Sequence, residues 1–194
     1  MSIKYYQDNA QAFFDSTIDV DMSELYAPFV EKLPSGAKIL DAGCGSGRDA
    51  KAFMSMGFDV EAIDASSELV KRARSIGINV ELKSFTEVTK TSYYDAIWAC
   101  ASLLHVPHNE LLDTMLSLSK SLKNGGVWYV SFKYGVDQRE KDGRLFSDLN
   151  ESTLERLVDS IKDIEISSIW VTTDKRPDRD ESWINAILRK TYEV

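Results

Sequence analysis

A short glycine-rich segment carries the residue types best suited to holding a charged ligand. Residues 41–49 read DAGCGSGRD, with three glycines at every second position. They follow the apolar run 38–40 and precede residues 50–56, whose helix formers and apolar stripe predict a helix. Glycine tolerates positive φ and leaves room for a ligand. The amides of such a strand-to-helix turn, with the positive end of the helix, favour a phosphate or a carboxylate.

Two acidic residues accompany this turn. Asp41 stands two residues before Gly43, and Asp64 ends the next apolar run, residues 60–63. A carboxylate at that strand end can accept hydrogen bonds from both hydroxyls of a ribose. The spacing G-x-G-x-G differs from the G-x-G-x-x-G of dinucleotide-binding turns. The ordered combination favours a ligand-binding turn over the alternative, a tight turn without a ligand.

Composition limits the class of protein. The 194 residues are enough for one domain with a full core, and 43% apolar and 28% charged residues are typical of a globular protein. No apolar run approaches the ~20 residues of a membrane span, and residues 1–8 lack the apolar core of a signal peptide. Cys44 and Cys100 predict free thiols, so we expect a cytoplasmic protein. The net charge of −8 argues against a nucleic-acid surface, and no Cys/His cluster has metal-ligand spacing.

Strands and helices alternate through the middle of the chain, which predicts a mostly parallel sheet with helices on both faces. Two alternating runs near the end, 162–171 and 182–190, predict an antiparallel finish. We expect a single domain over 1–194, with an N-terminal helical cap over 1–34 and a core over 35–194. Expected strands are 38–42, 59–63, 78–83, 93–99 and 126–133; expected helices are 4–17, about 21–33, 47–56, 66–75, 108–121 and about 150–160.

Two glycine-containing segments are predicted to lack regular structure. Asn124-Gly125-Gly126 is expected to break the chain before the fifth strand, and about 135–148 to form a long connection after it. Long connections are uncommon unless they are functional.

With its elements in this order, the chain resembles the class I S-adenosylmethionine-dependent methyltransferases. The resemblance rests on Asp41–Asp49, on Asp64 within residues 62–66, on residues 94–106 and on residues 122–131. It implies a Rossmann-like sheet of seven strands with an antiparallel last strand, an N-terminal helical lid, S-adenosylmethionine as the cofactor and methyl transfer as the activity. Gly47-Arg48-Asp49 and the Tyr-rich start resemble, more loosely, the tellurite-resistance or thiopurine-type small-molecule methyltransferases.

The resemblance also implies roles for individual residues. The glycines would let the loop approach the methionine part and the ribose, Asp41 would hold the methionine ammonium, and Asp64 would take the ribose hydroxyls. The expected cofactor-binding set is Tyr6, Asp41, Gly43, Cys44, Gly45, Gly47, Arg48, Asp64, Ala65, Ser84, Phe85, Thr86, Cys100 and Ala101.

Other residues are candidates for the acceptor side, each with a structural alternative. His105 is the candidate catalytic residue, as a general base or an orienting group; alternatively it packs at a helix start. Lys133 or Arg144 forms an anion site, or their segment is a solvated loop. Arg176 or Arg179 in a charged hairpin tip could gate the substrate. The expected substrate-binding set is Phe14, His105, Lys133, Tyr134 and Arg144.

Three functions remain open at this point. The first is a methyltransferase for a small soluble acceptor, acting as a monomer or a homodimer. The second is a methyltransferase for RNA or protein, docked through residues 135–148. The third is a non-enzymatic module that binds S-adenosylmethionine.

Overall fold

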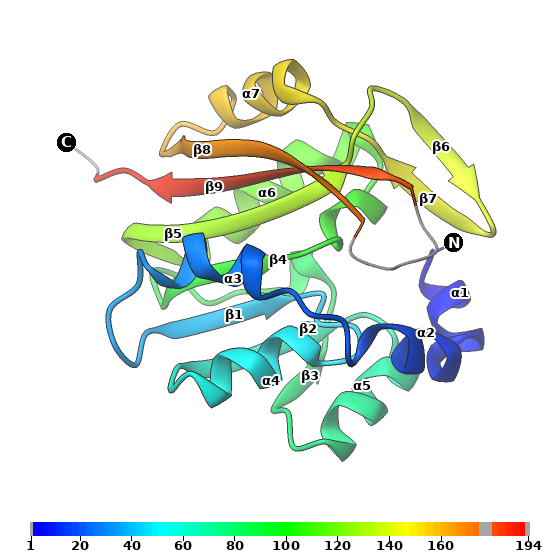
Figure 1. The fold of residues 1–194 in the computed structure, drawn as a ribbon. Helices are drawn as coiled ribbons and strands as arrows, with labels where there is room; N and C mark the ends of the chain where they lie inside the picture. The colour runs from blue at the N-terminus through cyan, green and yellow to red at the C-terminus, as the bar shows by residue number, and fades with distance from the viewer. Residues whose placement is uncertain (1, 175–179, 193–194) are drawn as a thin grey trace.

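A computed structural model describes residues 2–174 and 180–192, and its centre is a twisted sheet (Figure 1). Within the described residues this sheet has seven strands in the order β3-β2-β1-β4-β5-β9-β8. All neighbours pair in parallel except β9, which is antiparallel to β5 and to β8. The predicted mostly parallel sheet with an antiparallel last strand is confirmed. Its strands are β1 (Lys38–Ala42), β2 (Asp59–Asp64), β3 (Val80–Leu82), β4 (Tyr94–Ala99), β5 (Leu122–Lys133), β8 (Ile164–Thr173) and β9 (Ser182–Lys190).

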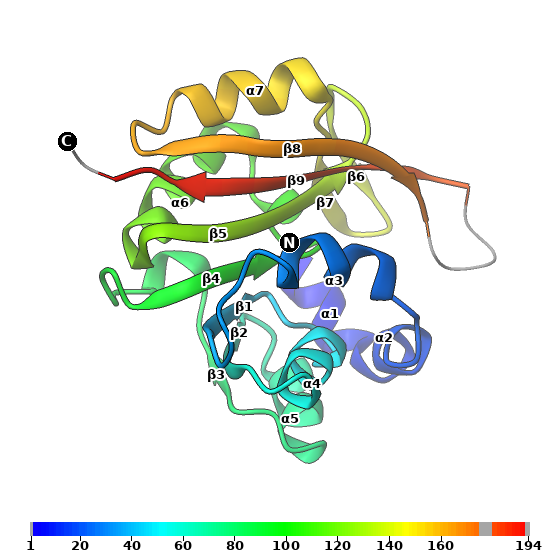
Figure 2. The same cartoon turned by 60° about the vertical axis from the view of Figure 1, so that its left-hand side comes forward.

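Helices cover both faces of the sheet, as the alternation of strands and helices predicts. Residues of α3, α4 and α5 pack on one face and residues of α6 and α7 on the other (Figures 1 and 2). The central strands are buried on both sides, which explains why β1 and β4 read as continuous apolar runs. The helices are α1 (Ser2–Asp8), α2 (Ala10–Thr17), α3 (Ser23–Val30), α4 (Arg48–Ser55), α5 (Ser67–Ser75), α6 (His108–Ser121) and α7 (Glu151–Asp159).

The N-terminal segment forms two helices where the sequence predicts one over residues 4–17. Helix α2 begins after Asn9, whose side chain bonds to the carbonyl oxygen of Tyr5 instead of capping α2. Both helices lie at the end of the sheet where β1 and β4 finish (Figure 1). None of the helices in the described residues has the length and apolar character of a membrane span.

The predicted break at Asn124-Gly125-Gly126 is wrong, because β5 already begins at Leu122. The register with β4 shifts between the Tyr94 and Ala96 pairs, so the two glycines lie in a bulge. Gly125 has a φ of 76°, which a bulge accommodates without ending the strand.

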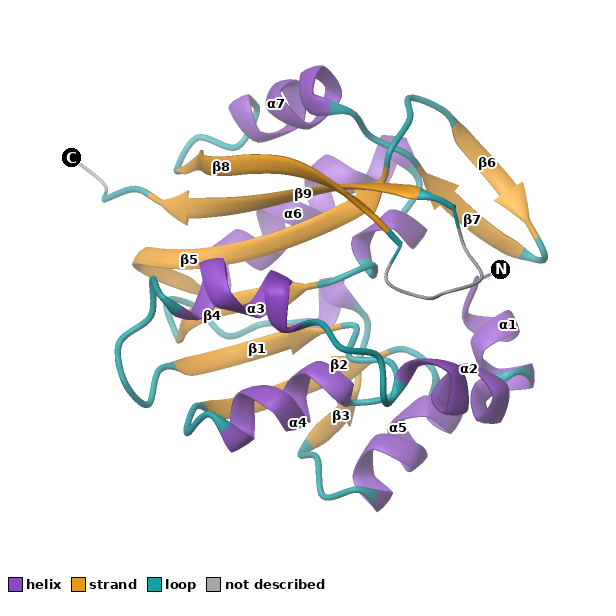
Figure 3. Ribbon diagram, viewed as in Figure 1, coloured by secondary structure: helices purple, strands orange, loops and turns teal. Residues whose placement is uncertain are grey.

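The expected long connection after β5 is a second, two-stranded sheet of β6 (Gln138–Lys141) and β7 (Arg144–Ser147), apart from the main sheet in Figure 3. Asp142 and Gly143 join the strands, both with positive φ. An Asp-Gly pair of this kind is the usual signal for a tight hairpin turn. The prediction is therefore wrong in type, and the hairpin stands at the same end of the sheet as α1 and α2 (Figure 3).

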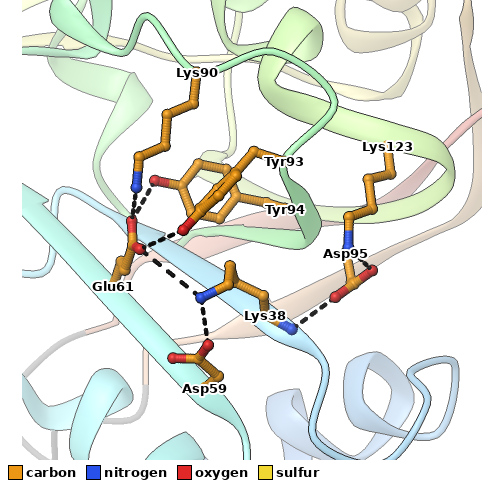
Figure 4. Close-up of polar contacts among 8 residues, drawn as sticks. All are labelled: Lys38, Asp59, Glu61, Lys90, Tyr93, Tyr94, Asp95 and Lys123. Carbon is orange, nitrogen blue, oxygen red and sulfur yellow. Dashed lines mark hydrogen bonds and ion pairs between the residues drawn. The ribbon is translucent and has the colours of Figure 1, made fainter.

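The opposite end of the sheet is tied by a polar network, drawn in Figure 4. Glu61 accepts hydrogen bonds from Lys90 at 2.5 Å and from the hydroxyls of Tyr94 and Tyr93 at 2.8 and 3.2 Å. Nearby, Lys123 pairs with Asp95, and Lys38 with Asp59. These contacts join β1, β2 and β4 where the strands begin, far from the residues with predicted chemistry.

Candidate functional site

The carboxyl ends of the parallel strands open into a cavity of about 740 Å³. Its walls come from the N-terminal helices, the glycine turn, the β6–β7 hairpin, and residues of β5, β8 and β9. Ligands of open α/β sheets bind at this edge, and the volume suits a cofactor or a small molecule.

The glycine turn passes close to its neighbours. The amides of Gly43 and Cys44 donate to the carbonyl oxygen of Ile63 at 2.9 and 3.0 Å, which ties the turn to β2. Gly43 has a φ of 82°, and a Cβ there would lie 2.5 Å from the Cβ of Ser102. A side chain at this position would therefore be strained and would collide with the loop after β4.

The other two glycines face different neighbours. A Cβ on Gly45 would lie 3.0 Å from the ring of Phe13, on the cavity side. A Cβ on Gly47 would meet Ile78 and Ala73 at 3.1 and 3.2 Å. Gly47 does not line the cavity, so its missing side chain lets the turn pack against α5 and the residue Ile78 that follows it.

Asp64 both holds the turn and faces the cavity. Its Oδ2 accepts from the amide of Gly45 at 2.9 Å, and its Oδ1 from the amide of Ser66 at 2.8 Å. Burial raises the pKa of this carboxyl, while the backbone hydrogen bonds oppose that rise. Asp64 thus joins the end of β2 to the glycine turn at the edge of the cavity.

Asp41 lies behind the turn and does not line the cavity. It is 2% exposed, and its Oδ2 has no hydrogen-bond partner. Burial raises its pKa well above the usual range, and the nearby carboxylate of Asp49 raises it further. A buried, unpartnered carboxyl oxygen of this kind favours the protonated form.

Arg48 and Asp49 form a bidentate ion pair at the start of α4, with distances of 2.6 and 3.0 Å. Asp49 also accepts from the hydroxyl of Tyr26 at 2.6 Å and from the indole of Trp98 at 2.8 Å. Burial would raise the pKa of Asp49, but Arg48 and these donors outweigh it and lower the pKa. Arg48 lines the cavity with its charge already matched.

His105 is held at both ring nitrogens. Its Nδ1 lies 2.6 Å from the carbonyl oxygen of Leu145, and its Nε2 lies 2.7 Å from the hydroxyl of Tyr6. Because a carbonyl oxygen only accepts, Nδ1 must carry the proton, and the neutral ring accepts from Tyr6 at Nε2. Burial lowers the pKa of His105 to about 4, and the bond to Leu145 opposes that shift. The hydroxyl of Tyr6 therefore occupies, by its hydrogen bond, the ring nitrogen with which a general base would accept a proton.

Lys133 lines the cavity and is paired. It is 5% exposed, forms a close ion pair with Glu181, and lies near the rings of Phe146 and Trp183. Burial lowers its pKa, and the pairing with Glu181 opposes the change. The charge of Lys133 in the cavity wall is therefore balanced by Glu181.

The cavity brings together most of the residues with predicted roles. Four described ones do not line it: Phe14, Asp41, Gly47 and Tyr134. Phe13, rather than Phe14, faces it from α2, and the exposed Tyr134 bonds to Glu151 at 2.8 Å. Asp41 and Gly47 lie behind the turn, and Arg176 and Arg179 fall outside the described residues. The predicted residues that line the cavity are Tyr6, Gly43, Cys44, Gly45, Arg48, Asp64, Ala65, Ser84, Phe85, Thr86, Cys100, Ala101, His105, Lys133 and Arg144.

Several aromatic and polar wall residues were not predicted. Tyr129 lies on the same face of β5 as Lys133, and its hydroxyl donates to Asn185 at 2.7 Å. Trp183 and Asn185 share that face of β9. The period-2 alternation of both strands carried this signal, because residues two apart on a strand face the same side. Phe146 was missed because its segment was assigned as an irregular loop.

Comparison with known proteins assigns the family. A family model described as a methyltransferase domain matches residues 14–157. The chain belongs to this family. One curated relative of this methyltransferase domain is the ubiquinone biosynthesis O-methyltransferase of Xanthomonas oryzae pv. oryzae (strain PXO99A), 31% identical over 105 residues. That match covers 50% of this chain and 43% of the relative, so it spans less than half of that enzyme.

Solved structures share the fold of the methyltransferase domain. The 1,6-didemethyltoxoflavin-N1-methyltransferase of Burkholderia thailandensis, with S-adenosylhomocysteine bound, matches with a TM-score of 0.79 and 22% identity, over 98% of this chain and 86% of that one. The [4+2]-cyclase SpnF matches with a TM-score of 0.72 and 19% identity, over 88% and 81%. Because one is named a methyltransferase and the other a cyclase, the fold by itself does not fix the reaction.

Proposed function

We propose that this protein transfers a methyl group from S-adenosylmethionine to a small soluble acceptor. The observation that carries the proposal is one cavity with two dissimilar halves. One half is the glycine turn with Asp64, and the other is walled by aromatic rings with Lys133 and Arg144.

The cofactor half has the parts that an adenosyl group and an amino acid need. Asp64 faces the cavity from the end of β2, where it would accept from the ribose hydroxyls while still holding the turn. Ala65 and the segment 84–86 would flank the adenine, and Cys100 and Ala101 would lie beside the methionine part. Asp41, behind the turn, would act on the methionine ammonium through water.

The protein would contribute alignment and exclusion of water. When bound, the cofactor supplies the methyl group and a good leaving group, so the acceptor needs in-line placement more than covalent help. Tyr6 and Phe13 stand over the cavity from α1 and α2. We assign these helices the role of a lid, with residues 1–34 as a cap on a single-domain core.

Two features bear on where a proton from the acceptor would go. His105 is neutral and accepts from Tyr6, so Tyr6 would receive a proton from the acceptor only while passing its own to His105. An acceptor that is already anionic needs no such transfer. We place the protein in the cytoplasm, which suits its free thiols Cys44 and Cys100.

The experiment is methyl uptake from labelled S-adenosylmethionine into the small-molecule and macromolecular fractions of a cell extract. We expect label in the small-molecule fraction, dependent on Asp64. Label confined to RNA or protein would contradict the small acceptor. Cofactor binding without transfer to either fraction would contradict the enzymatic role.

A further inference from the structure

The positively charged side chains that line the cavity differ in how closely a carboxylate pairs with them. Of the described lining residues, the Lys and Arg side chains are Arg48, Lys83, Lys133 and Arg144. The first three each hold a carboxylate within hydrogen-bond distance: Asp49 at 2.6 Å, Glu81 at 2.7 Å, and Glu181 in the close pair with Lys133.

Arg144 differs from the other three. Its side chain is 12% exposed, and the carboxylate it pairs with, that of Asp142, lies 3.6 Å away and is 63% exposed. Its Nε is buried without a hydrogen-bond partner. A buried donor left unpaired is costly, so the guanidinium of Arg144 is less fully satisfied than the other three charges.

Aromatic rings pack against the guanidinium of Arg144. The guanidinium carbon lies 4.2 Å from the ring centre of Tyr5 and 5.2 Å from that of Phe146. It also lies near the hydroxyl of Tyr6, whose pKa is raised by burial and lowered by Arg144. A stacked guanidinium keeps its N–H donors in a planar fork at the edge.

The same rings continue into an aromatic wall whose members meet edge-on or tilted. Phe13 meets Tyr6 at 5.1 Å between ring centres, Tyr6 meets His105 at 5.3 Å, and His105 meets Phe146 at 5.1 Å. Trp183 follows across Lys133. Aromatic walls of this kind favour offset or edge contacts with a planar ring.

We propose that Arg144 binds a carboxylate of the methyl acceptor, and that the acceptor is a small planar aromatic molecule. The inference rests on the proposed function, because it names the substrate class of the same cavity. A carboxylate matches the guanidinium fork with two parallel N–H···O bonds. It would accept from the terminal Nη donors of Arg144 and balance the one cation among the described lining residues that has no close carboxylate, while its ring lies against the aromatic wall.

The test compares aromatic acids with their neutral amides as ligands. The probes are benzoate, salicylate and 4-hydroxybenzoate, each against its amide, titrated into protein saturated with S-adenosylhomocysteine. We expect the wild type to bind at least one acid about tenfold or more tightly than its amide, as a charge-assisted pair would give. In Arg144→Gln that preference should fall to about twofold or less, and Arg144→Lys should keep part of it.

Lys141→Gln is the matched control, because Lys141 is the cross-strand partner of Arg144 and does not line the cavity. It removes the same charge from the same hairpin and should keep the wild-type preference. A wild type that prefers no acid over its amide would overturn the inference without any variant. So would a preference that survives in Arg144→Gln. If S-adenosylhomocysteine itself does not bind, the proposed function fails instead.

Discussion

Protonation of His105 should weaken the fold as the pH falls. In the native state burial holds the pKa of His105 at about 4, against an ordinary value of 6.5. Between these values the unfolded chain binds a proton that the native protein does not. The contribution of His105 to the free energy of unfolding is therefore fully present above about pH 6.5, and it is lost as the pH falls toward 4.

The size of the effect follows from that shift. The difference of about 2.5 pH units, at about 1.36 kcal/mol per unit, corresponds to about 3 kcal/mol over the whole window. About 2 kcal/mol of this is lost between pH 7.5 and pH 5, because most of the titration of the unfolded chain is complete by then.

Urea unfolding of the wild type and of His105→Gln at several pH values measures this contribution of His105 to the stability. The variant loses the bond from Tyr6 at every pH, but its free energy of unfolding should fall by about 2 kcal/mol less between pH 7.5 and pH 5. Groups that titrate alike in both proteins cancel in this difference. His108→Gln is the matched control, because it makes the same substitution at the other histidine of the chain.

Parallel pH profiles for the wild type and His105→Gln would refute the reasoning. They would mean that His105 is solvated in the native protein, and that the contacts with Tyr6 and Leu145 do not persist in solution.

Three further predictions concern the turn and the far end of the sheet. Asp64→Asn should weaken S-adenosylhomocysteine binding by about ten- to a hundredfold, measured by calorimetry, because charge-assisted bonds are lost. Gly43→Ala should lower the free energy of unfolding by about 1–3 kcal/mol in urea, because its φ of 82° is strained for alanine and its Cβ would meet Ser102 at 2.5 Å. Glu61→Gln should lower that free energy by up to about 1 kcal/mol with cofactor affinity unchanged, because the network in Figure 4 is partly exposed and lies away from the cavity.

Matched variants make these results specific. Asp59→Asn changes an acid at the other end of β2 and should leave the affinity unchanged. Gly57→Ala shares a positive φ, 90°, but has open space, so the excess loss in Gly43→Ala measures the collision. Equal effects within either pair, or a loss of cofactor affinity in Glu61→Gln, would contradict the roles assigned here.

The sequence predicts the core of the fold well, because its signals there are local and strong. Strand β1, the glycine turn and α4 follow from an apolar run, three glycines and a helical stripe. The bounds of β1 and α6 match the expected ones. Parallel strands buried on both faces leave long apolar runs that are hard to misread.

The errors arise where a local signal has two meanings. The glycines at 125 and 126 mark a bulge, whose pairing with β4 depends on residues far along the chain. Asp142-Gly143 forms a hairpin turn inside a charged segment that also reads as loop. Charge balance is likewise a tertiary property: Lys133 and Arg144 look equivalent in the sequence, and only the fold brings Glu181 to Lys133.

Titration calorimetry with S-adenosylhomocysteine and with NAD tests the central claim most directly. A turn spaced G-x-G-x-G, with Asp64 facing the cavity, predicts one-to-one binding of S-adenosylhomocysteine and no heat with NAD. Tight binding of NAD, with no heat from S-adenosylhomocysteine or S-adenosylmethionine, would contradict it.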